Sequence, residues 1–355
     1  MLEPPSVPSA VAAPPRPRVA VIVGAYRRET FLRDAVASVL AQTVPRSTME
    51  VLVTKNFDSP TLDPWLAHEG VRVLRDDEPR IGPWLWRAVS ATQAPLIAFL
   101  DDDDSWEPER LARVLEVFDG NPDLGYYRNR VRVTDVRGEP LPPGRWAPHE
   151  RDVELDRAGP VLVGPTEKVA RLPVVRRTYP LFNSSSIVVR RDVFRGEVVD
   201  RFLETQNPDP FLFLAAVLSP FGLFLDDRRL TRYREHPANI TRTLWAVRHG
   251  WEDSVRLAEL AERSAPAPYA KWLRARSVAI EKRVWTETIA ARVAERAPRA
   301  ELARLGAGYL RFLSRHRELM GLDGSTWAAP AYASAYIVAP ATVRRLRAGA
   351  ARTRG

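Results

Sequence analysis

The stretch Leu96-Ile97-Ala98-Phe99-Leu100-Asp101-Asp102-Asp103-Asp104-Ser105-Trp106 decides the fold. Its first five residues are apolar, which is typical of a strand buried on both faces of a sheet. Four carboxylates follow at once, and they repel one another unless a cation, basic neighbours or solvation offsets the repulsion. Open α/β sheets bind ligands at the carboxyl ends of their strands. The cluster therefore predicts a site for Mg²⁺ or Mn²⁺, which in turn can hold a diphosphate, although a solvated acidic turn at a helix N-terminus is the alternative.

Strand and helix patterns alternate on the amino-terminal side of this stretch. The run Val19–Val23 predicts a buried strand, and Thr30 is placed to cap a helix whose apolar residues recur at helical spacing. Further strands are expected at 50–53 and 71–74, and further helices at 83–92 and from Pro108. This alternation predicts an α/β fold with a doubly wound, mostly parallel sheet.

The patterns change on the carboxyl-terminal side. Strands are expected near Tyr126–Thr134 and at Ser186–Val189. Beyond residue 243 strand signals disappear, and helices are expected at Val255–Ala261, Ala270–Ala291 and Glu301–Leu313. We therefore expect a helical carboxyl-terminal region after the sheet.

Composition excludes several classes of protein. The 355 residues include no cysteine, which excludes disulfide scaffolds, thiolate metal sites and cysteine nucleophiles. The amino terminus lacks the pattern of a signal peptide, and the most apolar stretch, Phe211–Leu225, is shorter than the roughly 20 residues of a spanning helix. A soluble, cytoplasmic protein is expected.

The net charge of +9 resides in the last third of the chain. Residues 1–243 carry 33 Lys and Arg against 34 Asp and Glu, whereas residues 244–355 carry 20 against 10. No basic segment interleaved with aromatic residues or nucleic-acid-binding module accompanies this charge, so nucleic acid is not an expected partner. The basic end of the chain instead predicts a peripheral contact with a membrane or a partner, with a tail that packs or stays disordered as the alternative.

Two motifs together resemble the family 2 glycosyltransferases, whose fold is called GT-A. The first is Val21-Ile22-Val23-Gly24-Ala25-Tyr26-Arg27-Arg28, with the helix that follows it up to Gln42-Thr43, and the second is Phe99–Trp106. The resemblance covers about residues 18–243. It implies a metal-dependent, inverting enzyme that moves a sugar from a nucleotide-diphospho-sugar to an acceptor hydroxyl, with Mn²⁺ or Mg²⁺ as cofactor.

The resemblance also implies roles for individual residues. The loop that packs on the base, the helix near the ribose and phosphates and the adjoining carboxylates supply the donor-binding residues Ala25, Tyr26, Arg28, Lys55, Asn56, Gly82, Arg87, Asp101 and Asp102. The metal site is expected to include Asp103, Asp104 and His236, the last within Tyr233-Arg234-Glu235-His236-Pro237.

Two positions depart from the family pattern. Lys55 stands where an aspartate that binds the base is expected, and a cation cannot accept a hydrogen bond from a base N–H. The acidic pair expected to hold the catalytic base is reduced to Asp209, because Pro208 replaces its neighbour. Asp209 is the predicted base, Glu204 is the second candidate, and an N-cap role for Asp209 is compatible with catalysis.

The resemblance divides the chain into five parts. They are a disordered Pro-rich arm at 1–17, a nucleotide-sugar-binding half at 18–125, an acceptor-binding and catalytic half at 126–243, the helical region at 244–320 and a basic tail at 321–355. The acceptor is open among a cell-envelope glycan, a lipid-linked sugar and a small molecule, as are the nucleotide base and the oligomeric state. A non-catalytic sugar-nucleotide-binding protein is the alternative function. A serine hydrolase is not supported, because Ser184-Ser185-Ser186 has the pattern of a polar turn before a strand.

Overall fold

A computed structural model describes residues 16–142, 159–239 and 244–319. One sheet runs through the molecule in the order β3-β2-β1-β4-β8-β6-β9-β5, and β7 pairs with β9. The strands are β1 (Val19–Ala25), β2 (Met49–Lys55), β3 (Arg72–Arg75), β4 (Leu96–Asp101), β5 (Ser105–Trp106), β6 (Leu124–Thr134), β7 (Val161–Val163), β8 (Ile187–Arg190) and β9 (Gly222–Arg234). The helices are α1 (Leu32–Leu40), α2 (Leu62–His68), α3 (Ile81–Ser90), α4 (Arg110–Gly120), α7 (Lys168–Val175), α8 (Glu197–Phe202), α9 (Asp209–Leu218), α10 (Leu244–Ser264), α11 (Ala267–Ala294) and α12 (Arg299–Arg315).

The amino-terminal half of the sheet is parallel. β1 lies between β2 and β4, and β3 lies on the outer side of β2. Gly24 of β1 is in register with Asp101 of β4, so the acidic cluster begins where two neighbouring strands end together. The predicted α/β class is confirmed, and the connections from β1 and β4 diverge at this place, as ligand-binding edges of such sheets do.

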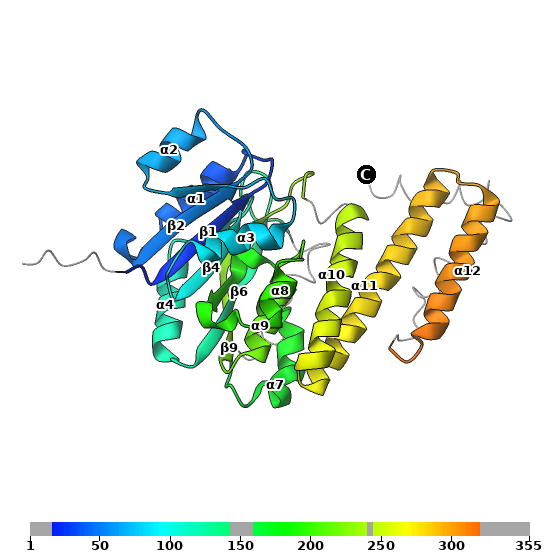
Figure 1. Cartoon of the computed structure of the whole chain (residues 1–355). Helices are drawn as coiled ribbons and strands as arrows, with labels where there is room; N and C mark the ends of the chain where they lie inside the picture. Colours follow the sequence, from blue (N-terminus) through cyan, green and yellow to red (C-terminus); the bar gives the residue numbers. More distant parts are fainter. Residues whose placement is uncertain (1–15, 143–158, 240–243, 320–355) are drawn as a thin grey trace, which may run out of the picture.

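Helices cover both faces of this half, because β1 is apolar on both sides. Val19, Val21 and Val23 pack on one face with apolar residues of α1, α2 and α4. Ala20 and Ile22 pack on the other face with residues of α3, α8 and α9. Figure 1 shows the two layers on either side of the sheet. A continuous apolar run is therefore the pattern that this position in the fold requires.

The second half of the sheet is mixed. β8 is antiparallel to β4 and to β6, whereas β6 and β9 are parallel. Because β8 runs against β4, the turn that precedes it, Ser184–Ser186, lies beside the carboxyl end of β4. The same arrangement brings the end of β9 and the residues after it to this edge.

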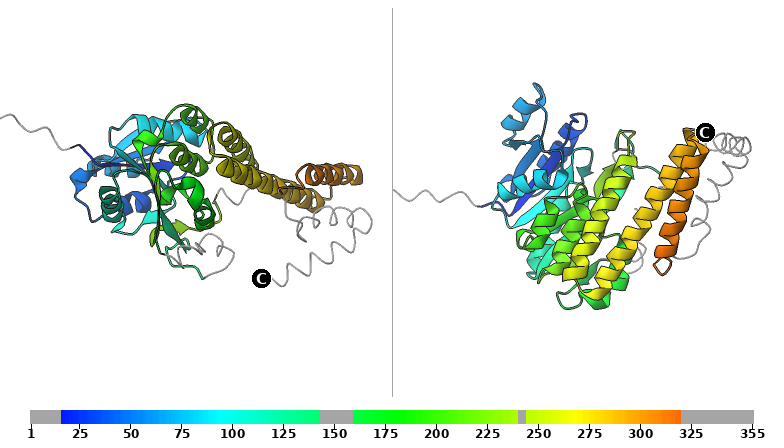
Figure 2. Two further views of the ribbon diagram at one scale, coloured as in Figure 1. Left: turned by 90° about the horizontal axis from the view of Figure 1, so that it is seen from below. Right: turned by 45° about the vertical axis from the view of Figure 1, so that its right-hand side comes forward.

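The helical region divides into two parts. Residues of α10 and of the first turns of α11 share the core of the sheet domain, where Tyr269 and Trp272 contact Phe213 of α9. The end of α11 packs with α12 in a separate apolar cluster. Figures 1 and 2 show α10, α11 and α12 at increasing distance from the sheet. The hydrophobic core of the sheet domain therefore continues past residue 243 into the helical region.

Three predicted helix starts differ from the structure. Leu32 N–H donates to the Glu29 carbonyl, so a turn precedes α1 and no capping bond from Thr30 is formed. Pro108 lies in a turn two residues before α4. Asp209 is the first residue of α9 and not its N-cap. In each case the pattern located the helix but not its first residue.

Two expected segments lie outside the description. They are the basic tail, 321–355, and all but the last two residues of the Pro-rich arm. None of the helices in the described ranges has a stretch long and apolar enough to span a lipid bilayer.

Candidate active site

The acidic cluster lies at the carboxyl ends of β1 and β4. The Asp102 N–H donates to the Gly24 carbonyl at 3.0 Å, which fixes the turn after β4 to the end of β1. Carboxylate oxygens of Asp101, Asp103 and Asp104 lie within 4.8 Å of one another. Oxygen atoms at this spacing fit Mg²⁺ or Mn²⁺, which prefer hard oxygen ligands. The cluster that the sequence predicted is therefore assembled in one place.

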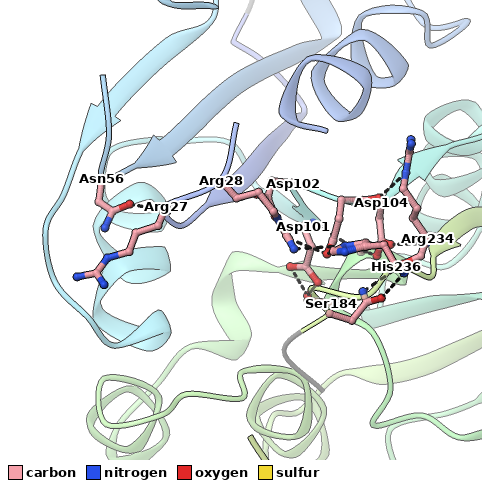
Figure 3. Close-up of polar contacts among 12 residues, drawn as sticks. Arg27, Arg28, Asn56, Asp101, Asp102, Asp104, Ser184, Arg234 and His236 are labelled. Atoms are coloured by element: carbon pink, nitrogen blue, oxygen red, sulfur yellow. Dashed lines mark hydrogen bonds and ion pairs between the residues drawn. The ribbon is translucent and has the colours of Figure 1, made fainter. Parts of the chain in front are cut away.

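Two basic residues contact the centre of the cluster (Figure 3). His236 Nε2 lies 3.0 Å from Asp103 Oδ2, and Arg28 Nη2 lies 2.6 Å from the same oxygen. Arg28 also donates through Nε to Asp102 at 3.0 Å. Burial raises the pKa of Asp103, but the hydrogen bond from His236 and the charge of Arg28 outweigh it, so the pKa is lowered. Asp103 is therefore the carboxyl of the cluster that ionises most readily.

The remaining carboxyls of the cluster have raised pKa values. Burial and the charge of Asp103 raise the pKa of Asp104 to about 7, against hydrogen bonds from Asn183 and Ser185. Burial also raises the pKa of Asp102 to about 6, although Arg28 opposes it. The pKa of Asp101 is raised by desolvation and by the negative charges of Asp104 and Asp103. Its residue nevertheless keeps a surface exposed to solvent. A bound cation would remove this strain between like charges.

Asp104 and Asp101 are tied to different elements. Both oxygens of Asp104 accept hydrogen bonds, Oδ1 from the Arg234 N–H and Oδ2 from Asn183 and Ser185. Asp101 accepts from the Ser184 hydroxyl at 3.0 Å and remains open to solvent. Asp104 therefore fixes the cluster to β9 and to the turn before β8, and Asp101 is the more accessible ligand.

Tyr26 and Asn56 lie directly after the carboxyl ends of β1 and β2. The Tyr26 ring is 37% exposed, contacts Trp84 edge to face and has the Arg27 guanidinium 5.2 Å from its centroid. The Asn56 side-chain oxygen accepts from the Arg27 N–H at 2.7 Å and so joins the loops after β1 and β2. Ala25, by contrast, is buried in the core, so its backbone and not its side chain can contact a nucleotide.

Lys55 is buried at the end of β2. Its side chain is 1% exposed, and the ammonium group lies 2.8 Å from an Asp63 oxygen and donates to the Phe57 carbonyl. The charge is thus used inside the loop between β2 and α2. Lys55 was expected among the donor-binding residues, but its buried ammonium group is used within the fold. Side chains along a strand alternate between its two faces, and only the structure shows which face Lys55 occupies.

Gly82 and Arg87 place α3 beside the site. The Gly82 N–H donates to the Thr205 carbonyl at 2.9 Å, and a Cβ at Gly82 would lie 1.8 Å from the Phe202 carbonyl oxygen. Arg87 is 60% exposed and forms an ion pair with the buried Asp76 after β3, at 3.1 Å. Asp76 was not identified from the sequence, since nothing in the acidic run Asp76-Asp77-Glu78 marks which carboxylate is buried.

Asp209 faces the acidic cluster across Ser184. Burial at the start of α9 raises the pKa of Asp209 to about 6, and hydrogen bonding from Asn183 and Ser184 opposes this rise. The Asp209 charge in turn acts on Asp101. Glu204 is 44% exposed and pairs with Arg201 at 2.9 Å, so the second candidate lies on the surface and not at the cluster.

Sequence reasoning missed the residues that connect these groups. Ser184 and Ser185, taken as a plain polar turn, bind Asp101 and Asp104. Asp253 of α10 accepts three hydrogen bonds from the loop before Asp209, from the Thr205 hydroxyl and the backbone N–H groups of Gln206 and Asn207, at 2.7 to 2.8 Å. The antiparallel direction of β8 would have located the serines, but no local signal marks Asp253.

Comparison with known proteins agrees with this geometry. Residues 20–170 match the family model described as Glycosyl transferase family 2. An uncharacterized glycosyltransferase of Nostoc sp. is 29% identical over 120 residues, which are 30% of this chain and 35% of that protein, so the match spans about a third of the relative's length.

Solved structures share the fold at low sequence identity. S. aureus TarS 1-349 in complex with UDP-GlcNAc is 13% identical, with a TM-score of 0.59 over 90% of this chain and 91% of that chain. The same protein in complex with UDP gives a TM-score of 0.53 at 14% identity over 73% and 70% of the two chains. Residues 20–170 are therefore similar to glycosyl transferase family 2, and the structure shares the GT-A fold of these solved structures.

Proposed function

We propose that the protein is a metal-dependent, inverting glycosyltransferase that moves a sugar from a nucleotide-diphospho-sugar to an acceptor hydroxyl. The observation that supports this most is the position of Ser184. Its hydroxyl donates to Asp101 of the acidic cluster at 3.0 Å, and Ser184 also lowers the pKa of Asp209, so it lies close to both carboxyls. A candidate metal ligand and a candidate base therefore adjoin one residue, as a reaction between two substrates at one opening requires.

The residues present fit a divalent cation. Asp101 and Asp103 would hold it, with His236 and Asp104 beside them. When bound, the cation supplies positive charge to the leaving diphosphate. Arg28, which contacts Asp102 and Asp103, is placed to neutralise the carboxylates before the donor binds. Tyr26 and Asn56 would orient the nucleotide.

Asp209 would act as the general base. A carboxylate with a pKa of about 6 is largely ionised at neutral pH, yet basic enough to take a proton from a hydroxyl as its oxygen attacks the anomeric carbon. The proton then rests on an Asp209 oxygen, and attack from the side opposite the leaving group inverts the anomeric carbon. The Asn183 and Ser184 contacts hold the carboxylate in place.

A donor panel tests the proposal. We expect one nucleotide sugar to raise the melting temperature with Mn²⁺ or Mg²⁺, since a ligand at 100 times its Kd stabilises by about 2.7 kcal/mol. The same donor should release its nucleoside diphosphate slowly in water. Asp103→Ala should lose the metal-dependent part of both effects. Stabilisation without release would support the alternative, a non-catalytic sugar-nucleotide-binding protein, and full activity in a chelator would exclude the metal.

We propose an acceptor from one of three classes and a peripheral contact with the membrane. A cell-envelope glycan, a lipid-linked sugar and a small molecule all offer a hydroxyl. Contact of the basic tail with an anionic membrane is proposed from its charge, and vesicle flotation of the full chain and of a chain ending at Gly324 tests it. If the full chain ignores anionic vesicles at low salt, the contact does not occur.

A further inference from the structure

A cavity of about 290 Å³ lies where α3, the loop before Asp209 and the helical region meet. Its polar lining consists of Gln206 and Asn207 of the loop, His249 of α10, and Arg276 and Arg283 of α11. No carboxylate occurs among the described residues that line it. The cavity therefore combines cationic groups and amides without a built-in anion.

Arg276 is the arginine of this cavity whose charge is not balanced by an ion pair within the described ranges. It forms no hydrogen bond or ion pair with any residue in the described ranges, and its side chain is partly buried. Burial lowers its pKa to about 10, and the negative charge of Asp209 opposes this effect. Arg283 lies two helical turns further on the same face of α11 but already pairs with Glu287 at 2.6 Å. A planar guanidinium with free donors matches a carboxylate or a phosphate in two-point contact.

The cavity adjoins the candidate base. Asn207 is two residues before Asp209, and the charge of Asp209 acts on Arg276. The acidic cluster, where the donor diphosphate is expected, adjoins Ser184, and none of its carboxylates lines the cavity. If the acceptor hydroxyl contacts Asp209, a second group of the same acceptor is therefore the one that can occupy the cavity.

We propose that this cavity binds an anionic group of the acceptor, a phosphate or a carboxylate, and that Arg276 is its principal ligand. The inference rests on the proposed function, because it assigns the acceptor side of that site. It extends the site to α11, far beyond the segment by which the family is recognised.

Titration calorimetry of the full chain tests the proposal with three probes: glycerol 3-phosphate, glucuronate and glycerol. We expect at least one anion to bind tenfold or more tightly than glycerol, and the tighter anion shows whether the group is a phosphate or a carboxylate. Arg276→Gln should weaken that binding at least tenfold, and Arg276→Lys should weaken it less. The matched control is Arg274→Gln, which lies on α11 like Arg276. Because Arg274 pairs with Glu262 of α10 at 2.7 Å, this variant should leave anion binding within twofold.

Three results would overturn the proposal. They are equal binding of glycerol and both anions, unchanged anion binding by both Arg276 variants, and a tenfold loss of UDP or GDP affinity with Mn²⁺ in Arg276→Gln, which would assign the cavity to the donor. Melting curves verify that each variant is folded. If the wild-type protein hydrolyses no donor, the proposed function fails, whereas the anion titration still decides whether the cavity binds anions.

Discussion

Asp209 is expected to set the acidic limit of activity. Its carboxyl must be ionised to accept a proton, so kcat/KM should rise with pH through about 6 and level off above it. A bound cation nearby would shift this limit to lower pH. Asp209→Asn should lower kcat by roughly 100-fold or more and remove the acidic limb. Profiles between pH 5 and 8 measure both effects, and Glu204→Gln, which changes a surface carboxylate, should retain the wild-type profile. A wild-type profile in Asp209→Asn would remove Asp209 from the mechanism.

Lys55 is expected to support the fold. Replacing it by alanine removes the cationic partner of Asp63 and leaves a space beneath the Phe57 loop. The loss should be about 2 kcal/mol, less than for a fully buried pair, because the Asp63 side chain is 36% exposed. The melting temperature should fall by several degrees, while the ranking of nucleotide donors stays the same. Lys271→Ala, at an exposed position, is the control. A changed ranking at an unchanged melting temperature would restore Lys55 to the donor site.

Helix α10 positions the loop that carries the base. Asp253 is buried, and one of its oxygens accepts all three hydrogen bonds from residues 205–207. Asp253→Asn keeps the shape but weakens these charge-assisted bonds, so we expect a loss of about 2 kcal/mol and a fall in kcat larger than the change in KM for the donor. Thermal melts and donor hydrolysis measure the two effects. The control is Glu252→Gln, one residue away and exposed. Stability and turnover equal to those of the wild-type protein in Asp253→Asn would show that the loop keeps its conformation without the charge of Asp253.

Some features of the fold and of the site could be predicted from the sequence, and others could not. The buried strand before Asp101 and the alternation around it contained enough information for the α/β class, because a strand covered on both faces must be apolar throughout. The acidic cluster was predicted for the same reason. The direction of Lys55, the role of Ser184 and the contact of Asp253 depend on which elements lie side by side, and the antiparallel turn of the sheet at β8 decides that. Contacts between residues far apart in the sequence produce no periodic pattern of residue types.

The whole molecule is expected to need α10 and the start of α11 for folding. A chain ending at residue 243 would expose the apolar residues of α9 that Tyr269 and Trp272 cover, and it would lose the bond from the Tyr269 hydroxyl to the Lys168 carbonyl. We expect this shorter chain to show no cooperative melting transition. A chain ending at residue 319 should melt cooperatively and be stabilised by the same donor and metal as the full chain. Cooperative melting of the shorter chain would show that the sheet domain folds alone.

The contact at Gly82 limits how this gene can recombine. No space exists between its Cα and the Phe202 carbonyl, and the Thr205 carbonyl accepts its N–H, so each partner is shaped to the other. One partner lies within residues 20–170, the segment that matches the family model, and the other lies beyond it. A chimaera that joins the first half of this chain to the second half of a relative inherits one partner without the other. Such crossovers should yield folded hybrids only when both parents bring the backbone equally close at this point.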